Sequence, residues 1–267
     1  MNHPTISLEL NRIDNGVWQK DLGRTPTEIP VLLTVNGNPW VEFMCTPEHL
    51  DALAVGFLFN EGLIDCAKDI AQSRVCPKGD NVDVWTSHPI EKPSHWRMTS
   101  GCAGGITSVG MEAGLPEKEL PAPPRGFLCQ FEELTLNPSM INGLILDLYR
   151  VQELHRQSGG VHASALSDGR HLFLSCEDIG RHNTLDKLAG RVLLENIVEP
   201  RRIILTTGRI SSEMLQKSAS LGVSVVISFT SPTSLAVQLA DQWGMTLIGY
   251  AQNKHFKIYS HPERIEA

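Results

Sequence analysis

Between residues 161 and 250 the sequence alternates short apolar runs with segments of helical periodicity, and this alternation constrains the fold most. The runs 203–205 and 223–227 are apolar at nearly every position, which is typical of strands covered on both faces. The sequence therefore predicts an α/β layer architecture in which helices pack on a sheet. The expected strands are 161–166, 171–176, 202–206, 223–228 and 245–250, and the expected helices are 182–195, 211–221 and 233–243.

The N-terminal part contains one hairpin signal and one helix signal. Two apolar, β-branched runs, 29–35 and 40–45, flank Asn36-Gly37, a dipeptide typical of a two-residue hairpin turn. Thr46-Pro47-Glu48 predicts a helix start, with a capping hydroxyl, a proline in the first turn and an acid near the positive end. The first ten to fifteen residues are expected to be a loose arm or an edge strand.

Prolines mark the connection between the two parts of the chain. Residues 114–126 include Pro116 and the run Pro121-Ala122-Pro123-Pro124, which excludes regular helix and indicates a connector. After it, Asn137-Pro138 predicts the start of a long amphipathic helix to about residue 157, ended by Gly159-Gly160. We expect a smaller mixed α+β domain over residues 1–125 and a larger layered α/β domain over residues 126–267.

The composition excludes several classes of protein. Hydrophobic residues make up 41% and charged residues 20% of the 267, so a disordered chain is not expected. With 23 basic and 30 acidic residues the net charge is −7, which offers no general attraction to nucleic acid or to an anionic membrane. No apolar run approaches the roughly 20 residues needed to span a bilayer. Scattered cysteines and the lack of a leader indicate a reducing cytoplasm.

One cysteine stands in a loop suited to thiol chemistry. Cys102 lies in Ser100-Gly101-Cys102-Ala103-Gly104-Gly105, where glycines remove side-chain bulk and free the backbone. Such a loop can present the sulfur to a partner and aim N–H groups that lower the pKa of the thiol, but it can equally be a plain glycine turn. Because position 105 is glycine, this loop cannot form its own disulfide. The remaining cysteines are interpreted as packing or incidental thiols without zinc-ligand spacing: Cys45, Cys66, Cys76, Cys129 and Cys176.

Three predicted strand-to-helix turns carry polar residues. They span residues 177–183, 206–213 and 228–234, and the first two contain Arg181 and Arg209. Arginine together with the N–H groups of a first helical turn suits a phosphate or a carboxylate, although each turn can also be a simple helix cap. Three successive strand ends of this kind favour an anionic, nucleotide-like ligand at one sheet edge. The sequence lacks both the P-loop and the Gly-x-Gly-x-x-Gly patterns.

A catalytic metal is not expected. His162 in Gly160-Val161-His162-Ala163 is the remaining candidate ligand, and a lone strand histidine is more often structural. A zinc deaminase needs a glutamate two residues further on and a later Pro-Cys-x-x-Cys. Position 164 is serine and no such cysteine pair follows, so we reject catalytic zinc.

Several segments together resemble one known family in the same order along nearly the whole chain. The segments are 56–62, Ser100-Gly101-Cys102, 159–166, 177–183 with Asp186-Lys187, 207–214, 231–236 and 247–259. They are similar to the FdhD family of formate dehydrogenase accessory sulfurtransferases, and Gly180-Arg181-His182-Asn183 is the most specific match.

This resemblance implies a cytoplasmic maturation factor and a homodimer. Such proteins take persulfide sulfur from a cysteine desulfurase and pass it to the molybdenum cofactor, a bis-guanine dinucleotide, before its insertion into the formate dehydrogenase catalytic subunit. The family's larger domain is similar to the cytidine deaminase fold without zinc. The persulfide-carrying cysteine falls on Cys102, and the segment contacting the guanine dinucleotide falls on Tyr250, Ala251, Gln252, Asn253, Lys254 and His255.

Two positions depart from the family pattern. Gly105 stands where many members have a second loop cysteine, and Gln252 stands where arginine is common. Lys254, His255 or Arg209 could replace the lost cation. The resulting hypothesis is a sulfur carrier in which Cys102 holds the persulfide while Arg181, Arg209 and the segment at Tyr250 bind the cofactor. The alternative is a cofactor-binding chaperone without sulfur chemistry.

Overall fold

The structure is a computed structural model that describes residues 3–94, 120–124, 134–199, 203–252 and 254–266, and the backbone of 96–98 and 106–108. Cys102, Gly105, Cys129, Asn253 and the expected domain boundary at 125/126 lie outside the described residues. The assignments made for them stay predictions.

The larger sheet has six strands in the order β10-β9-β11-β12-β13-β14. Strands β11, β12 and β13 are parallel, whereas the other neighbours are antiparallel. This confirms a mixed α/β fold; the likeness to cytidine deaminase stays a prediction. The strands are β9 (His162–Ser167), β10 (Leu172–Asp178), β11 (Ile203–Thr206), β12 (Val225–Ser228), β13 (Thr246–Gln252) and β14 (His255–Ser260), of which β14 was not among the expected strands.

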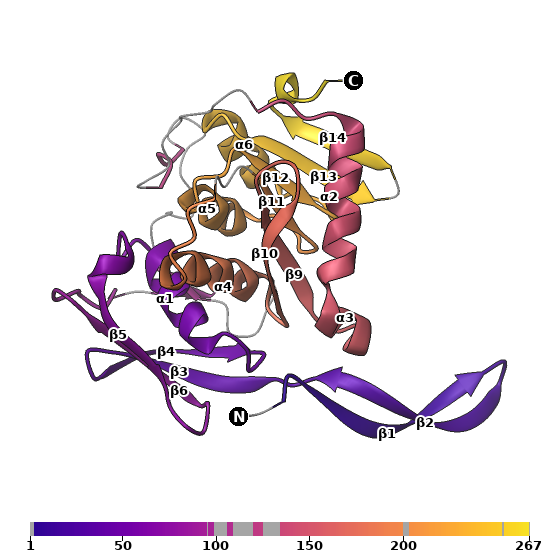
Figure 1. Ribbon diagram of the computed structural model, residues 1–267, viewed down its shortest axis with the longest axis horizontal. Coiled ribbons are helices and arrows are strands. Elements are labelled where there is room, and N and C mark those ends of the chain that lie inside the picture. The colour runs from indigo at the N-terminus through magenta and orange to yellow at the C-terminus, as the bar shows by residue number, and fades with distance from the viewer. Residues whose placement is uncertain are drawn as a thin grey trace.

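Helices cover both faces of this sheet (Figure 1). On one face α2 (Pro138–Val151) packs against Ile203 and Val225. On the other face α4 (Arg181–Leu194), α5 (Ser212–Ser220) and α6 (Ser234–Gln242) pack against Ile204 and Val226. Consecutive apolar residues in β11 and β12 therefore enter two different cores, as the sequence predicted. The expected helix to residue 157 is broken at Gln152, after which α3 (Glu153–Ser158) follows.

A second sheet of four strands, in the order β4-β3-β6-β5, lies in the N-terminal part. Asn36 and Gly37 both have positive φ, at 50° and 76°, which confirms the predicted hairpin between β3 and β4. Helix α1 (Leu50–Asn60) packs on this sheet. The strands are β3 (Ile29–Val35), β4 (Asn38–Cys45), β5 (Ile70–Val75) and β6 (Asn81–Thr86), and a two-stranded pair is formed by β7 (Trp96–Met98) and β8 (Ile106–Ser108).

The predicted start of α1 was wrong. Thr46 does not cap the helix; instead His49 occupies the N-cap position, with a φ of 51° and no side-chain capping bond. The hydroxyl of Thr46 donates to Asp178 Oδ2 at 2.9 Å, a residue at the end of β10. Thr46 therefore joins the two parts of the protein and does not cap a helix.

Helices α1 and α4 approach closely because each carries a glycine at the crossing. A Cβ at Gly56 would fall on the carbonyl oxygen of Asp186, and one at Gly190 would fall on the carbonyl oxygen of Ala52. The close contact fastens the helix of the smaller sheet to a helix of the larger one.

The chain begins with a long hairpin arm, formed by β1 (Thr5–Asp14) and β2 (Val17–Pro26). The turn residues Asn15 and Gly16 have φ angles of 49° and 83°, so they form the same kind of tight turn as Asn36-Gly37. The expectation of a single loose segment or edge strand missed the second strand. The arm projects from the body of the protein (Figure 1). Among the described residues, no helix is long and apolar enough to cross a membrane.

Candidate functional site

The polar turns predicted from the sequence meet at one edge of the six-stranded sheet. Strands β11, β12 and β13 are parallel, so their carboxyl ends share an edge. Strand β9 is antiparallel to both β10 and β11, so it begins at that edge while β10 ends there. The edge is thus built from His162, the turn after Asp178, and the segments that follow Thr206, Ser228 and Gly249.

Hydrogen bonds join these segments into one surface. The hydroxyl of Ser228 donates to the carbonyl oxygen of Gly208 at 2.7 Å. The amide of Gln252 donates to the carbonyl oxygen of Phe229 at 2.8 Å. The backbone N–H of Tyr250 donates to the carbonyl oxygen of Thr230 at 3.0 Å. Each bond joins segments 20 to 23 residues apart in sequence, so the segments after Thr206, Ser228 and Gly249 are held side by side.

The two predicted arginines are on adjacent turns. A Cβ at Gly208 would lie 2.8 Å from Cβ of Arg181, so glycine lets the Arg181 side chain pass along this backbone. Arg181 is buried at the start of α4, whereas Arg209 is exposed just before α5. The N-terminal N–H groups of both helices also belong to this edge. Two cations and two helix N-termini together favour the binding of an anion at this edge.

His182 is a buried member of the same site. Its Nε2 lies 3.2 Å from Oε2 of Glu213, in the first turn of α5. Burial lowers the pKa of His182, so the imidazole is neutral near pH 7. The carboxylate beside Nε2 favours the tautomer with its proton on that nitrogen. Nδ1 is then an acceptor. Within the part of the chain that the structure describes, neither ring nitrogen makes a hydrogen bond of good geometry, so the contact of Nε2 with Glu213 is mainly electrostatic.

His162 has a structural contact at the start of β9. Its Nδ1 lies 3.3 Å from Oγ1 of Thr207, and that oxygen also accepts the backbone N–H of Ala163 at 3.0 Å. Burial, followed by the charge of Arg181, lowers the pKa of His162. No group of three His, Cys, Asp or Glu residues within the described ranges could hold a metal ion.

Asp178 holds the turn before α4 in place through buried polar contacts. The sequence patterns did not predict this role. Its carboxylate accepts the backbone N–H groups of Thr46 at 3.1 Å and Gly180 at 2.8 Å, and lies 2.6 Å from Nζ of Lys187. The Nδ2 of Asn183 donates to it at 2.8 Å. The turn that carries Arg181 and His182 is thereby fixed to the N-terminal sheet.

A second buried ionic group lies further along α4. Nζ of Lys217 is 2.7 Å from Oδ1 of Asp186, and the amide of Asn60 donates to the same oxygen at 2.7 Å. Although burial opposes it, the negative charge of Asp186 raises the pKa of Lys217. In the sequence, this ionic group is indicated only by Asp186 and Lys217, which are charged residues at helix positions that face the core.

The predicted cofactor segment is at the turn between β13 and β14. Tyr250, Gln252, Lys254 and His255 are exposed, whereas Ala251 is buried in the core. Tyr250 has a φ of 53°, and its ring lies 4.6 Å from Nζ of Lys257. The segment therefore offers an aromatic ring and cations beside the polar turns.

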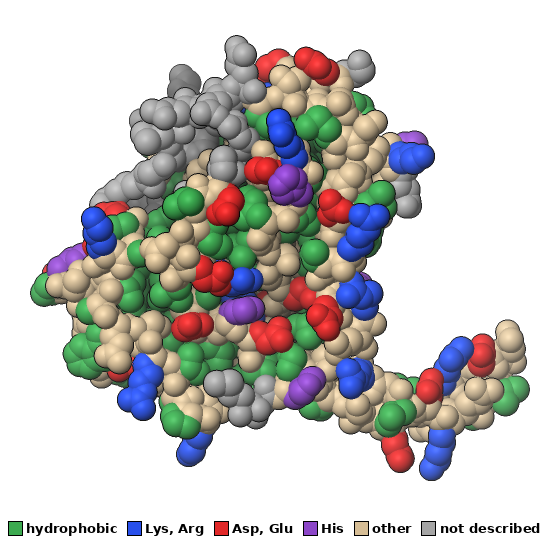
Figure 2. Space-filling model, in the orientation of Figure 1, with side chains coloured by type: hydrophobic (Ala, Val, Ile, Leu, Met, Phe, Trp, Pro, Cys, Tyr) green, Lys and Arg blue, Asp and Glu red, His purple; other side chains and the backbone are tan. Residues whose placement is uncertain are grey.

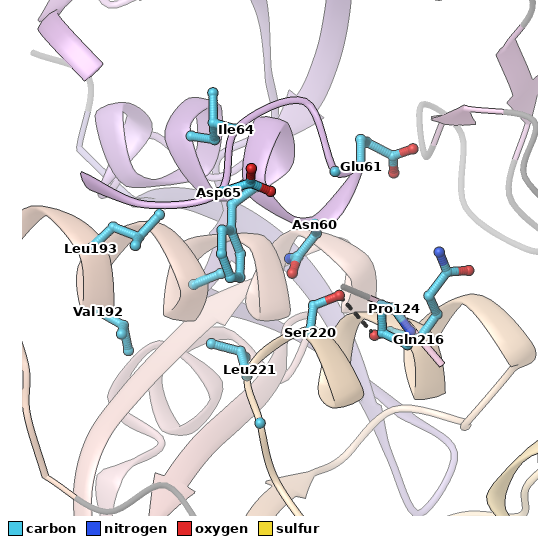
Figure 3. A pocket seen from close by; sticks show the side chains of 14 residues that line it. Asn60, Glu61, Ile64, Asp65, Pro124, Val192, Leu193, Gln216, Ser220 and Leu221 are labelled. Carbon is cyan, nitrogen blue, oxygen red and sulfur yellow. Dashed lines mark hydrogen bonds between the residues drawn. The ribbon is translucent and has the colours of Figure 1, made fainter. Parts of the chain in front are cut away.

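A separate cleft of about 800 Å³ lies between the ends of α1, α4 and α5 (Figure 3). It is lined by Phe59, Asn60, Asp65, Leu193, Gln216 and Ser220 among others. Helix α5 begins at the sheet edge with Ser212 and reaches this cleft at Ser220. The cleft was not predicted, and it lies away from the polar turns.

The described cysteines differ in exposure. Burial raises the pKa of Cys45 to about 12 and that of Cys176 to about 11, so both are protonated packing residues, as expected. Cys66 is exposed, and Sγ of Cys76 donates to Asp80 at 2.9 Å.

Comparison with known proteins gives the family. The model of the FdhD/NarQ family matches residues 26–266. This chain belongs to the FdhD/NarQ family. It is 35% identical over 264 residues to the sulfur carrier protein FdhD of Bacillus subtilis, covering 98% of this chain and 97% of that protein. It is 34% identical to the FdhD protein of Staphylococcus haemolyticus over 246 residues, covering 90% and 89%.

The fold is similar to that of a solved structure. A protein from Desulfotalea psychrophila, described as a candidate formate dehydrogenase accessory protein, superposes with a TM-score of 0.75 at 27% identity. The match covers 99% of this FdhD/NarQ chain and all of the other.

Proposed function

We propose that this protein is a sulfur carrier that serves formate dehydrogenase maturation, moving persulfide sulfur through Cys102 to the bis-guanine dinucleotide molybdenum cofactor. The observation that carries the proposal is family membership over nearly the whole chain, with relatives named sulfur carrier proteins. A cytoplasmic location, a cysteine desulfurase as donor and the formate dehydrogenase catalytic subunit as recipient belong to the same proposal.

The sheet edge supports binding of the cofactor's guanine dinucleotide ends. Their pyrophosphates are anionic, and the edge has Arg181, Arg209 and two helix N-termini. Tyr250 offers an exposed ring on which a base could stack. Since the whole chain has a net charge of −7, this local group of cations must provide the attraction.

The sulfur step follows thiol–disulfide chemistry. The Cys102 thiolate attacks the terminal sulfur of the desulfurase persulfide; a new S–S bond forms on Cys102, the donor S–S bond breaks, and the desulfurase cysteine leaves as a thiolate. Cys102 then holds a persulfide whose terminal sulfur is passed to the cargo. With Gly105 in place of a second cysteine, a single thiol performs the step.

Binding of guanosine diphosphate, a probe for the end of the cofactor, tests the ligand site. Arg209→Ala and Tyr250→Ala are each expected to weaken binding about tenfold, Arg209→Ala through the loss of a charge-assisted contact and Tyr250→Ala through the loss of base stacking. Arg170→Ala is the matched control because Arg170 is exposed in the turn between β9 and β10, at the opposite end of the strands. Equal binding by all four proteins would contradict the assignment of the site.

Gly105 favours one alternative, a cofactor-binding chaperone without sulfur chemistry. The two functions differ in Cys102→Ser. A sulfur carrier with this substitution binds guanosine diphosphate normally but no longer supports maturation of formate dehydrogenase. If maturation continues, the chaperone function is correct.

A further inference from the structure

A group of three buried hydroxyls lies where the two arginine turns leave the sheet. They belong to Ser164 in β9, Thr184 in α4 and Thr206 in β11, and all three residues are fully buried. Ser164 and Thr206 are directly paired residues of two antiparallel strands, so their side chains share one face of the sheet. Helix α4 packs on that face and brings Thr184 into contact with Ser164.

Hydrogen bonds join the three hydroxyls to one another and to both turns. Oγ of Ser164 lies 2.7 Å from Oγ1 of Thr184 and donates to Oγ1 of Thr206 at 2.9 Å. At one end, Thr184 donates to the carbonyl oxygen of Arg181 at 2.7 Å. At the other end, Oγ1 of Thr206 accepts the backbone N–H of Gly208 at 3.1 Å. A continuous path of hydrogen bonds therefore runs from the start of α4 to the loop that precedes α5.

Gly208 is the residue that this path fixes most directly. Its N–H donates to Thr206, and its carbonyl oxygen accepts a hydrogen bond from the hydroxyl of Ser228 at 2.7 Å. The side chain of Arg181 passes along this backbone, since a Cβ added at Gly208 would lie 2.8 Å from Cβ of Arg181. A shift of the Gly208 peptide therefore moves the surface on which Arg181 lies, and it moves Arg209, the next residue in the chain.

The placement of these two arginines matters because the rest of the protein offers little attraction to an anion. The net charge is −7, and on the face that Figure 2 shows, the Lys and Arg side chains are scattered among Asp and Glu. Charge-assisted hydrogen bonds also require a short distance and a good angle. A diphosphate is therefore bound well only when both cations stand at the separation that its two phosphates require.

We propose that Ser164, Thr184 and Thr206 are positioning residues, whose hydroxyl groups set the distance between the two arginine turns and thereby the affinity for the diphosphate part of the ligand. The inference rests on the ligand site proposed above and adds the residues that hold it in shape. None of the three is exposed, so they act through the arginines and not on the ligand. Apolar residues fill the neighbouring positions of the same face, Leu166 and Ile204, at a lower cost of burial.

Binding of guanosine diphosphate tests the inference through paired substitutions at one position. Thr206→Val keeps the shape of the side chain but removes the hydroxyl, whereas Thr206→Ser keeps the hydroxyl and removes a methyl group. We expect Thr206→Val to weaken binding about fivefold, as for the loss of one hydrogen bond, and Thr206→Ser to bind like the wild type. Ser164→Ala breaks the same path in β9 and should weaken binding to a similar extent.

The free energy of unfolding is measured on the same variants, because a buried polar residue can also act on folding alone. Thr246→Val is the matched control. Thr246 is fully buried too, and its hydroxyl donates to the carbonyl oxygen of His261 at 2.9 Å, at the opposite end of the parallel strands. This variant should be destabilised like Thr206→Val but bind guanosine diphosphate normally. Thr206→Ser should likewise lose stability, through the small cavity it leaves, without losing affinity.

Hydrogen exchange at the amide of Gly208 tests the positioning without a ligand. In Thr206→Val this N–H loses its acceptor and should exchange about fivefold faster relative to the amides of β11. In Thr206→Ser and in Thr246→Val the relative rate should stay that of the wild type. An unchanged relative rate in Thr206→Val would overturn the inference.

The binding results separate this inference from the proposed function. If Arg209→Ala binds guanosine diphosphate as tightly as the wild type, the ligand site itself is wrong and the inference falls with it. If Arg209→Ala binds weakly but Thr206→Val and Ser164→Ala bind like the wild type, only this inference is overturned. Equal weakening by Thr206→Val and Thr246→Val would also overturn it, because the effect would then come from stability alone.

Discussion

Lys187 and Asp178 form an ion pair inside the protein, with 2.6 Å between Nζ and Oδ2 and both side chains fully buried. The pair lies between β10 and α4, directly beneath the turn that carries Arg181. Nζ of Lys187 also donates to the hydroxyl of Thr46 at 2.8 Å, so the N-terminal sheet shares the interaction.

Removing one partner of this pair is expected to destabilise the protein strongly. Asp178→Asn or Lys187→Met leaves an uncompensated buried charge, which costs about 3–5 kcal/mol of unfolding free energy. Chemical denaturation measures the change. Glu195→Gln is the control, since it breaks the partly exposed pair with Arg191 and should cost less than about 1 kcal/mol. Equal losses in the buried and exposed pairs would contradict this account.

A single methyl group added at the crossing of α1 and α4 is expected to lower the free energy of unfolding. Gly56→Ala and Gly190→Ala each place a Cβ on a backbone carbonyl and should lower the unfolding free energy by about 1–3 kcal/mol. Gly143→Ala, in the open part of α2, should instead stabilise by about 0.5–1 kcal/mol through helix propensity. Thermal melts of the three variants distinguish the two effects by their sign.

Stability is expected to fall as the pH drops below about 6.5, the ordinary pKa of histidine. Burial lowers the pKa of both His162 and His182 in the folded protein. The unfolded chain therefore binds more protons in this range, and its population grows as the pH falls. His182→Gln should flatten the dependence of unfolding free energy on pH between about 7 and 5. An unchanged slope would mean that His182 does not titrate on unfolding.

The accessible thiols should react long before the buried ones. Cys66 is exposed and is expected to be alkylated within the native protein, whereas Cys45 and Cys176 have raised pKa values and are buried. Peptide mass spectrometry after brief alkylation measures the order. Labelling of Cys45 as fast as that of Cys66 would contradict its place in the core.

The larger sheet could be predicted because its signals are local. Apolar runs such as 203–205 identify strands covered on both faces, and the positions of Arg181 and Arg209 after strand ends place them at one edge. The same logic found the hairpin at Asn36-Gly37. It missed the equivalent turn at Asn15-Gly16, because the second strand of the arm, VWQKDLGRTP, is mostly polar and lacks the regular alternation of a strand with one buried face.

The supporting contacts could not be predicted because they join residues far apart in the sequence. Thr46 has the pattern of a helix cap, and only the fold brings its hydroxyl to Asp178, 132 residues away. The Asp186–Lys217 pair likewise depends on how α4 and α5 pack. Sequence patterns identify groups suited to bind a ligand, whereas their mutual support depends on tertiary packing.

The central claim is that Cys102 accepts sulfur from a desulfurase. Intact-mass analysis of the protein after incubation with a cysteine desulfurase and cysteine tests it most directly. The account predicts a species heavier by one sulfur atom, mapped to Cys102, reversed by reductant and missing in Cys102→Ser. An unmodified wild type, or equal modification of wild type and Cys102→Ser, would contradict it.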